Sequence, residues 1–148
     1  MTAFPYRHLL LAADFAPETD CVVARAAELR AHLQARLTLL HVVEYLPMSY
    51  SGDLVLPEDF DLEQELVDVA KRQMAVLGER LGVPPEDRRI ETGSTGRTIL
   101  RVAEEVGADL IVLGSHGRHG LAVLLGSTAR SVLNGAKCDV LAVRLGTA

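Results

Sequence analysis

The sequence contains no tryptophan, and aromatic residues make up only 4% of its 148 positions. It also lacks any apolar run near the roughly 18 residues that a membrane-spanning helix requires. Its first residues, MTAFPYRHLLLAADF, show no basic cluster followed by a long apolar stretch and a small-residue cleavage site. We therefore expect neither a membrane protein nor a secretory leader, and a cytoplasmic location.

Blocks of basic residues are missing as well, and the formal net charge is −5 at pH 7. Without a basic patch, no nucleic-acid partner is expected. Cys21 and Cys138 are the only cysteines, and they are far apart with no CxxC spacing. The histidines have no metal-ligand spacing either. We accordingly expect reduced cysteines, no disulfide framework and no metal site.

Short apolar runs alternate with longer segments of helical period along the whole chain, which predicts an α/β fold with a parallel sheet covered by helices on both faces. A chain of this length without a linker or an internal repeat is expected to form one domain, residues 1–148. The weakly apolar run RRIET predicts an edge strand. The five expected strands are His8–Ala13, Leu37–Val43, Arg88–Thr92, Asp109–Leu113 and Asp139–Arg144. Four helices are expected to end at or near Gln34, Gly82, Gly107 and Gly135.

Several glycine and polar residues follow the ends of the predicted strands. In an open parallel sheet, ligands bind beyond the carboxyl ends of the strands, where the strand order reverses. Asp14 follows the first strand, and the residues GSHG, at 114–117, follow the fourth. Glycine lets backbone N–H groups reach an anion, and Gly126-Ser127-Thr128 begins a helix whose free N–H groups and dipole favour phosphate. This constellation predicts a phosphate-binding cradle.

Each of these residues also has a purely structural interpretation. Glycines between strands and helices are common turn residues, and Ser127 could be an ordinary N-cap. Asp14 could cap the loop that enters the first helix, and Arg118 could bind phosphate or lie in solvent. No carboxylate in the adjacent loop orients His116, so we interpret it as a hydrogen-bonded loop residue and not as a general base or a metal ligand.

The motifs of other doubly wound folds are absent. The first strand is followed by AADFAPET and not by the GxGxxG of dinucleotide-binding folds, and the chain has no GxxxxGK[ST]. The paired acids of a phosphate-receiving signalling domain are missing, because Ala13 precedes Asp14. A flavin site usually offers aromatic stacking, which this composition disfavours.

Three segments resemble the universal stress protein domain and together extend over nearly the whole chain. They are YRHLLLAADFAPET, LTLLHVV and DLIVLGSHGRHGLAVLLGSTARSVLNGAKCDVLAVR. The resemblance implies a three-layer sandwich with a five-stranded parallel sheet of order 3-2-1-4-5. It also implies a role in stress response and a homodimer formed through the last strand, here Val140, Leu141, Ala142 and Val143.

The resemblance further implies ATP binding, with magnesium. In the family's nucleotide-binding branch, the residue that matches Asp14 and the backbone of the one that matches Val42 hold adenine and ribose. Gly114, Gly117, Gly126 and Ser127 match the triphosphate-binding positions. The full set of expected nucleotide-binding residues is Ala12, Asp14, Val42, Leu113, Gly114, Gly117, Arg118, Gly126, Ser127 and Thr128.

One departure from the family pattern lies between the second and third of these glycines. Eight residues, Arg118 to Leu125, separate them, where the pattern has nine. The shorter loop leaves open ADP, AMP or another phosphorylated ligand, or a nucleotide-independent module that docks to an unidentified protein. The loop has no lysine and no acidic pair, so a dedicated enzyme is not expected, and any ATP hydrolysis should be slow. A weak ATPase that acts as a nucleotide-triggered switch is a further alternative.

Overall fold

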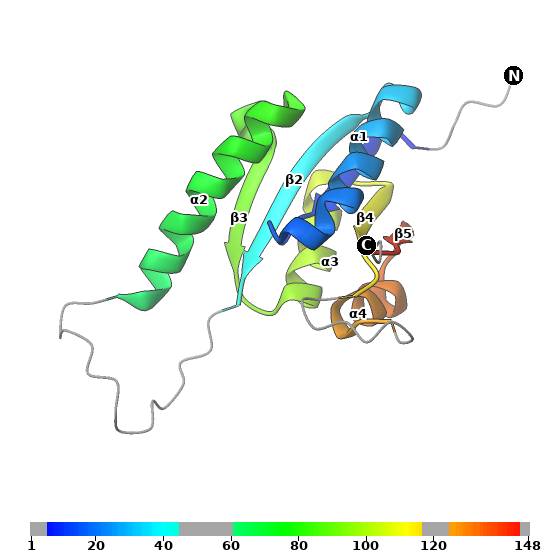
Figure 1. The fold of residues 1–148 in the computed structure, drawn as a ribbon. Coiled ribbons are helices and arrows are strands. Elements are labelled where there is room, and N and C mark those ends of the chain that lie inside the picture. Colours follow the sequence, from blue (N-terminus) through cyan, green and yellow to red (C-terminus); the bar gives the residue numbers. More distant parts are fainter. Residues whose placement is uncertain (1–5, 45–60, 117–124, 146–148) are drawn as a thin grey trace, which may run out of the picture.

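A computed structural model describes residues 6–44, 61–116 and 125–145 of the chain. Its five strands form one parallel sheet of order β3-β2-β1-β4-β5 (Figure 1). This confirms the predicted fold class and strand order, and each predicted strand end lies within one residue of the observed one. The strands are β1 His8–Ala12, β2 Arg36–Val43, β3 Arg88–Thr92, β4 Leu110–Gly114 and β5 Asp139–Val143.

The helices of the described segments also follow the predicted order. They are α1 Asp20–Leu33, α2 Leu62–Leu81, α3 Thr95–Val106 and α4 Ser127–Gly135, with short 3-10 turns at Pro17–Thr19 and Pro85–Asp87. Gly82 and Gly107 close α2 and α3 with φ angles of 64° and 72°, a left-handed conformation that glycine adopts without strain. Across the described residues, no helix has the length and apolar character needed to cross a membrane.

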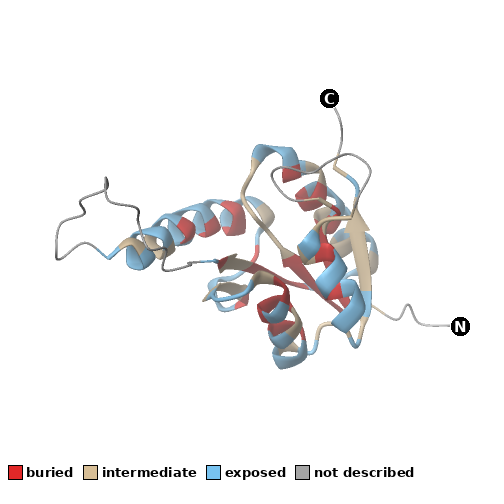
Figure 2. Cartoon of the chain, turned by 90° about the horizontal axis from the view of Figure 1, so that it is seen from below, coloured by how far each residue is buried: buried red, intermediate tan, exposed pale blue. Residues whose placement is uncertain are grey.

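The sheet lies between two layers of helices. Helices α1 and α2 cover one face, and α3 and α4 cover the other (Figure 1). Alternate residues of β1 point to opposite faces, so Leu9 and Leu11 pack beneath α1 and α2 while Leu10 packs beneath α3 and α4. All three have no exposed surface, and the central strands form the buried centre in Figure 2. The continuous apolar runs in the sequence reflect this burial on both faces.

Helices α3 and α4 approach each other closely because glycines occupy the contact. A Cβ atom at Gly96 would lie 2.6 Å from Ser131 Oγ, and one at Gly135 would lie 2.7 Å from Leu100 Cδ1. Helices α1 and α2 instead stand apart on the opposite face, where a cavity of about 340 Å³ lies between them. The two helical layers therefore differ in how tightly they close over the sheet.

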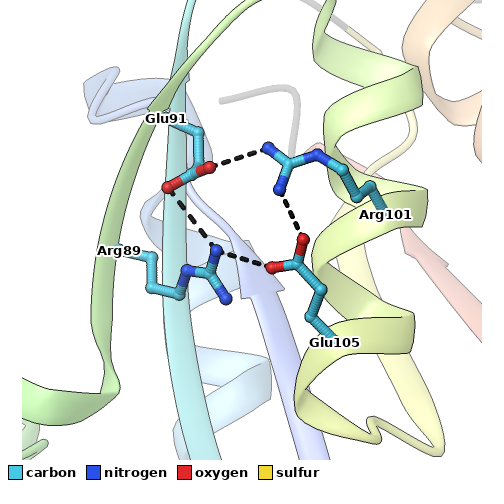
Figure 3. A network of polar contacts seen from close by, with 4 residues as sticks. All are labelled: Arg89, Glu91, Arg101 and Glu105. Carbon is cyan, nitrogen blue, oxygen red and sulfur yellow. Dashed lines mark hydrogen bonds and ion pairs between the residues drawn. The ribbon is translucent and has the colours of Figure 1, made fainter.

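Edge strand β3 is fastened to α3 by a closed ring of ion pairs (Figure 3). Arg101 contacts Glu91 at 2.7 Å and Glu105 at 2.6 Å, and Arg89 contacts the same two carboxylates at 3.6 and 2.8 Å. The two guanidinium groups lower the pKa of Glu105. Charged side chains of this kind discourage an edge strand from pairing with another chain.

Polar side chains fasten the opposite, amino-terminal ends of the strands. Arg36 forms a two-bond contact with the largely buried carboxylate of Asp87, at 2.5 and 3.0 Å. This contact holds the pKa of Asp87 below its ordinary value. The buried His8 has its Nε2 atom 2.7 Å from Thr38 Oγ1, and burial, with a smaller contribution from Arg36, lowers the pKa of the imidazole. This end of the sheet is structural, because its polar groups satisfy one another.

Candidate functional site

A cleft of about 770 Å³ opens at the carboxyl ends of β1, β2 and β4. Its walls come from these strand ends, from the loop between β1 and α1, from one side of α2, and from the first turns of α3 and α4. This volume is within the range of small-molecule sites, roughly 300–1,000 Å³. Because the walls include the carboxyl ends of neighbouring parallel strands, the cleft is also at the position that the strand order predicts for a ligand.

Every predicted ligand-binding residue that falls within the described segments lines this cleft. Gly117 and Arg118, together with all but the last residue of the eight-residue loop, lie outside those segments. The topology thus brings together residues from four separate parts of the sequence. The lining residues are Ala12, Asp14, Val42, Leu113, Gly114, Gly126, Ser127 and Thr128.

Asp14 organises the loop between β1 and α1 through one of its two carboxylate oxygens. The backbone N–H of Ala16 donates to Asp14 Oδ1 at 2.9 Å, and the Thr19 hydroxyl lies 2.7 Å from the same oxygen. Oδ1 therefore caps the loop that enters the first helix, as the structural interpretation of Asp14 expected. Among the described residues no group donates to Oδ2, so the second oxygen is available to a ligand in the cleft.

The next residue, Phe15, stabilises the same loop in a way the sequence did not indicate. Its φ of 64° is in the left-handed region, which a bulky residue rarely adopts. The ring stacks against the His41 imidazole of β2, with centroids 4.4 Å apart. His41 Nδ1 lies 2.6 Å from the Ala13 carbonyl oxygen, so Nδ1 carries the proton and donates it. These contacts join the ends of β1 and β2 on one side of the cleft.

The first turn of α4 faces the cleft with its backbone N–H groups. Gly126 is the N-cap residue, and its own N–H donates to the Ser115 carbonyl at 2.7 Å, which fixes the start of α4 to the end of β4. Ser127 is the first helical residue, so the interpretation of its side chain as an ordinary N-cap is wrong. No described side chain caps the start of α4. Among the described residues the N–H groups of Ser127 and Thr128 have no acceptor, and such groups favour an anion.

Gly114 ends β4 next to this helix start. A Cβ atom built there would make only ordinary contacts, the nearest at 3.4 Å to Leu145 Cδ2. Its φ is not in the left-handed region that requires glycine. Packing within the described residues therefore does not by itself require a glycine at this position.

The charged side chains that line the described part of the cleft are acidic. They are Asp14 and Glu44, and no lysine or arginine of the described segments lines it. Glu44 was not predicted as a site residue; its Oε1 accepts the N–H of Thr95 at 2.8 Å and so caps α3. Its place directly after a predicted strand was the only sequence signal. Without a lysine or arginine in the described lining, an anion there would be held by backbone N–H groups, the α4 dipole and uncharged side-chain donors such as the Ser127 and Thr128 hydroxyls.

Helix α2 contributes an apolar wall that sequence reasoning also missed. Leu66 and Val69 line the cleft although they are 38% and 37% exposed. His116 lies nearby, with its Nδ1 atom 2.8 Å from Ser115 Oγ. Within the ranges that the structure describes, no three His, Cys, Asp or Glu side chains gather as a metal site would require. The cleft thus combines apolar surface, backbone donors and two carboxylates.

Comparison with known proteins agrees with this geometry. The profile of the Universal stress protein family matches residues 5–144. Universal stress protein A homolog 1 of Coxiella burnetii is 40% identical over 138 residues, which cover 93% of this chain and 96% of that protein. The solved structure of hypothetical protein MJ0577 superposes with a TM-score of 0.81 at 25% identity, covering 98% of this chain and all of that one.

A solved universal stress protein in complex with cAMP superposes with a TM-score of 0.69 at 25% identity and covers 97% of this chain and 100% of that one. The strand order, the place of the cleft and these matches all lead to the same assignment. The family profile covers almost the entire sequence, including every element that lines the cleft. The chain belongs to the universal stress protein family.

Proposed function

We propose that this protein binds an adenine nucleotide, ATP with magnesium, in the cleft, and that it acts as a dimeric regulator of a cytoplasmic stress response. The observation that carries the proposal is the start of α4, where Ser127 and Thr128 present N–H groups without protein acceptors in the described segments. A phosphate group satisfies such donors and interacts favourably with the helix dipole. The cAMP complex of a relative supports a nucleotide as ligand.

The other side of the cleft suits a nucleoside. In this proposal Asp14 Oδ2 accepts a hydrogen bond from a ribose hydroxyl, while Oδ1 holds the loop. The backbone at Val42 is available to the edge of a base, and Leu66 and Val69 offer apolar surface to its faces. A nucleotide matches these surfaces: its planar base would face the apolar wall, its sugar the Asp14 carboxylate, and its phosphates the N–H groups of α4.

Magnesium is part of the proposal because the cleft is lined by negative charges and a triphosphate adds more. Asp14 and Glu44 line the cleft, and the described lining contains no cationic side chain. A triphosphate brought next to two carboxylates needs a cation to reduce the repulsion, and Mg²⁺ is usually bound by substrate phosphates together with few protein ligands. ADP and AMP carry less charge and are the alternative ligands.

Strand β5 is proposed as the dimer contact. It forms one edge of the sheet, and its residues Val140–Val143 are only partly buried although all four are apolar. Pairing two β5 edges would continue the sheet and cover these side chains. Light scattering at micromolar concentration tests this contact, and a monomer mass would contradict it.

The nucleotide proposal is tested by calorimetric titration of nucleotide-stripped protein with ATP, ADP, AMP and cAMP, each with magnesium and with EDTA. Micromolar binding of Mg-ATP that weakens in EDTA supports the proposal. If AMP or cAMP binds more tightly than Mg-ATP, the ligand of the cleft is a nucleoside monophosphate and not a triphosphate. Absence of heat and of a thermal shift with all four would leave a nucleotide-independent docking module.

A further inference from the structure

A second cavity lies between α1 and α2, beside the nucleotide cleft. Its volume is about 340 Å³, at the lower end of the range of small-molecule sites, roughly 300–1,000 Å³. Ala13, Thr19, Val23 and Gln73 line both spaces, so one wall separates them. The cavity exists because α1 and α2 stand apart, whereas the glycines of α3 and α4 close the opposite layer.

The cavity has apolar walls from both helices and from the loop between β1 and α1. Phe15 and Val23 contribute from one side, and Val76 and Leu77 contribute from α2. Val76 is 71% exposed, the largest exposed fraction among the large apolar residues of the described segments. A valine this exposed on a helix face beside a cavity is stabilised when an apolar occupant covers it.

Two arginines on the same face of α2 give the cavity a positive rim. Arg72, Val76 and Arg80 are spaced by four residues and therefore lie in one row of the helix. Arg80 pairs with Asp20 of α1 at 3.5 Å, which joins the two helices at one end of the cavity. Arg72 has no carboxylate within ion-pair distance among the described residues, so its guanidinium is the uncompensated charge.

We propose that this cavity binds a small amphipathic carboxylate, with its hydrocarbon part against Phe15, Val76 and Leu77 and its carboxylate at Arg72. An apolar wall beside a guanidinium that has no ion-pair partner among the described residues matches a compound with one apolar body and one anionic end. Arginine suits this role because its planar group donates two parallel hydrogen bonds to a carboxylate. Arg72, Val76 and Leu77 line this cavity and not the cleft, so the site can form whether or not the cleft binds nucleotide.

The test uses sodium octanoate as the probe, titrated into the full chain by calorimetry, with amide chemical shifts to locate it. Saturable binding is expected, with shifts concentrated in residues 15–23 and 72–80. Arg72→Gln should weaken binding about tenfold, the effect of one lost charge-assisted hydrogen bond. Lys71→Gln is the matched control, because it removes the same charge from the neighbouring exposed position, which lines neither cavity.

Two further measurements separate this site from unspecific adsorption. Val76→Asp places a negative charge beside the apolar wall and should abolish octanoate binding, while circular dichroism stays unchanged because the side chain is mostly exposed. Octan-1-ol has the same chain without the charge and should bind more weakly than octanoate. The proposal is overturned if octanoate does not bind, if Arg72→Gln leaves its affinity unchanged, or if octan-1-ol binds as tightly.

Discussion

Replacing Ser127 with proline removes one backbone N–H from the α4 start with little expected cost to the fold. Proline is favoured at the first position of a helix, where the N–H takes no part in the helical ladder. The first ladder bond of α4 runs from the Arg130 N–H to the Gly126 carbonyl. Gly126 has φ −63° and ψ 158°, an extended conformation that a following proline favours.

The expected result is weaker nucleotide binding by a protein of unchanged stability. One hydrogen bond to a charged group contributes about 1.5–3 kcal/mol, so Ser127→Pro should weaken Mg-ATP binding by roughly ten- to a hundredfold. Ser127→Ala is the control, because it removes the hydroxyl and keeps the N–H. Calorimetric titration compares the two variants, and thermal unfolding checks the fold. Equal affinities for the proline and alanine variants would refute the assignment of this N–H to phosphate binding.

Three predictions concern stability. Gly78→Ala should lower the free energy of unfolding by about 1–3 kcal/mol in urea denaturation, because the new Cβ would lie 2.0 Å from Arg88 Nε and displace a guanidinium that donates to the Val83 carbonyl. His8 has a lowered pKa in the folded protein, so below its ordinary value of 6.5 the unfolded chain binds more protons. Stability should therefore fall as the pH drops below 6.5, and His8→Gln should remove this part of the slope. Glu105→Gln breaks the ring of ion pairs between β3 and α3. It should lower the melting temperature more in low salt than in high salt, since salt screens these solvent-accessible charges. Equal shifts of the melting temperature at both salt concentrations would contradict an electrostatic role.

The strands could be predicted because their burial leaves a strong local pattern. Leu9, Leu10 and Leu11 are fully buried on alternating faces, and such a run has few alternatives to a central parallel strand. The glycines at helix ends were equally informative, as Gly82 and Gly107 show. The place of the cleft followed from topology alone, since the carboxyl ends of parallel strands meet at one edge.

The missed features depend on contacts between distant residues. Glu44 caps α3 across 51 positions of sequence, and no local pattern marks a carboxylate for that role. Phe15 adopts a positive φ that its residue type disfavours, and the compensating ring of His41 belongs to another strand. Gly126-Ser127-Thr128 does begin α4 as predicted, and only the alternative of Ser127 as an ordinary N-cap is wrong, because Gly126 holds that position with its N–H bonded to the Ser115 carbonyl.

Asp14 and Thr19 link the fold, the cleft and the second cavity. The Thr19 hydroxyl has one proton but two acceptors in reach, Asp14 Oδ1 at 2.7 Å and the Ala16 carbonyl at 2.6 Å. A ligand that donates to Asp14 Oδ2 draws charge from Oδ1, and this favours donation from Thr19 to Ala16 instead. Thr19 also lines the cavity between α1 and α2, so the residue belongs to the walls of both sites. The two proposed sites therefore share Thr19, whose hydroxyl has two acceptors in reach. For one ligand to alter the affinity of the other, each ligand must in addition bind the two hydrogen-bond arrangements with different affinity.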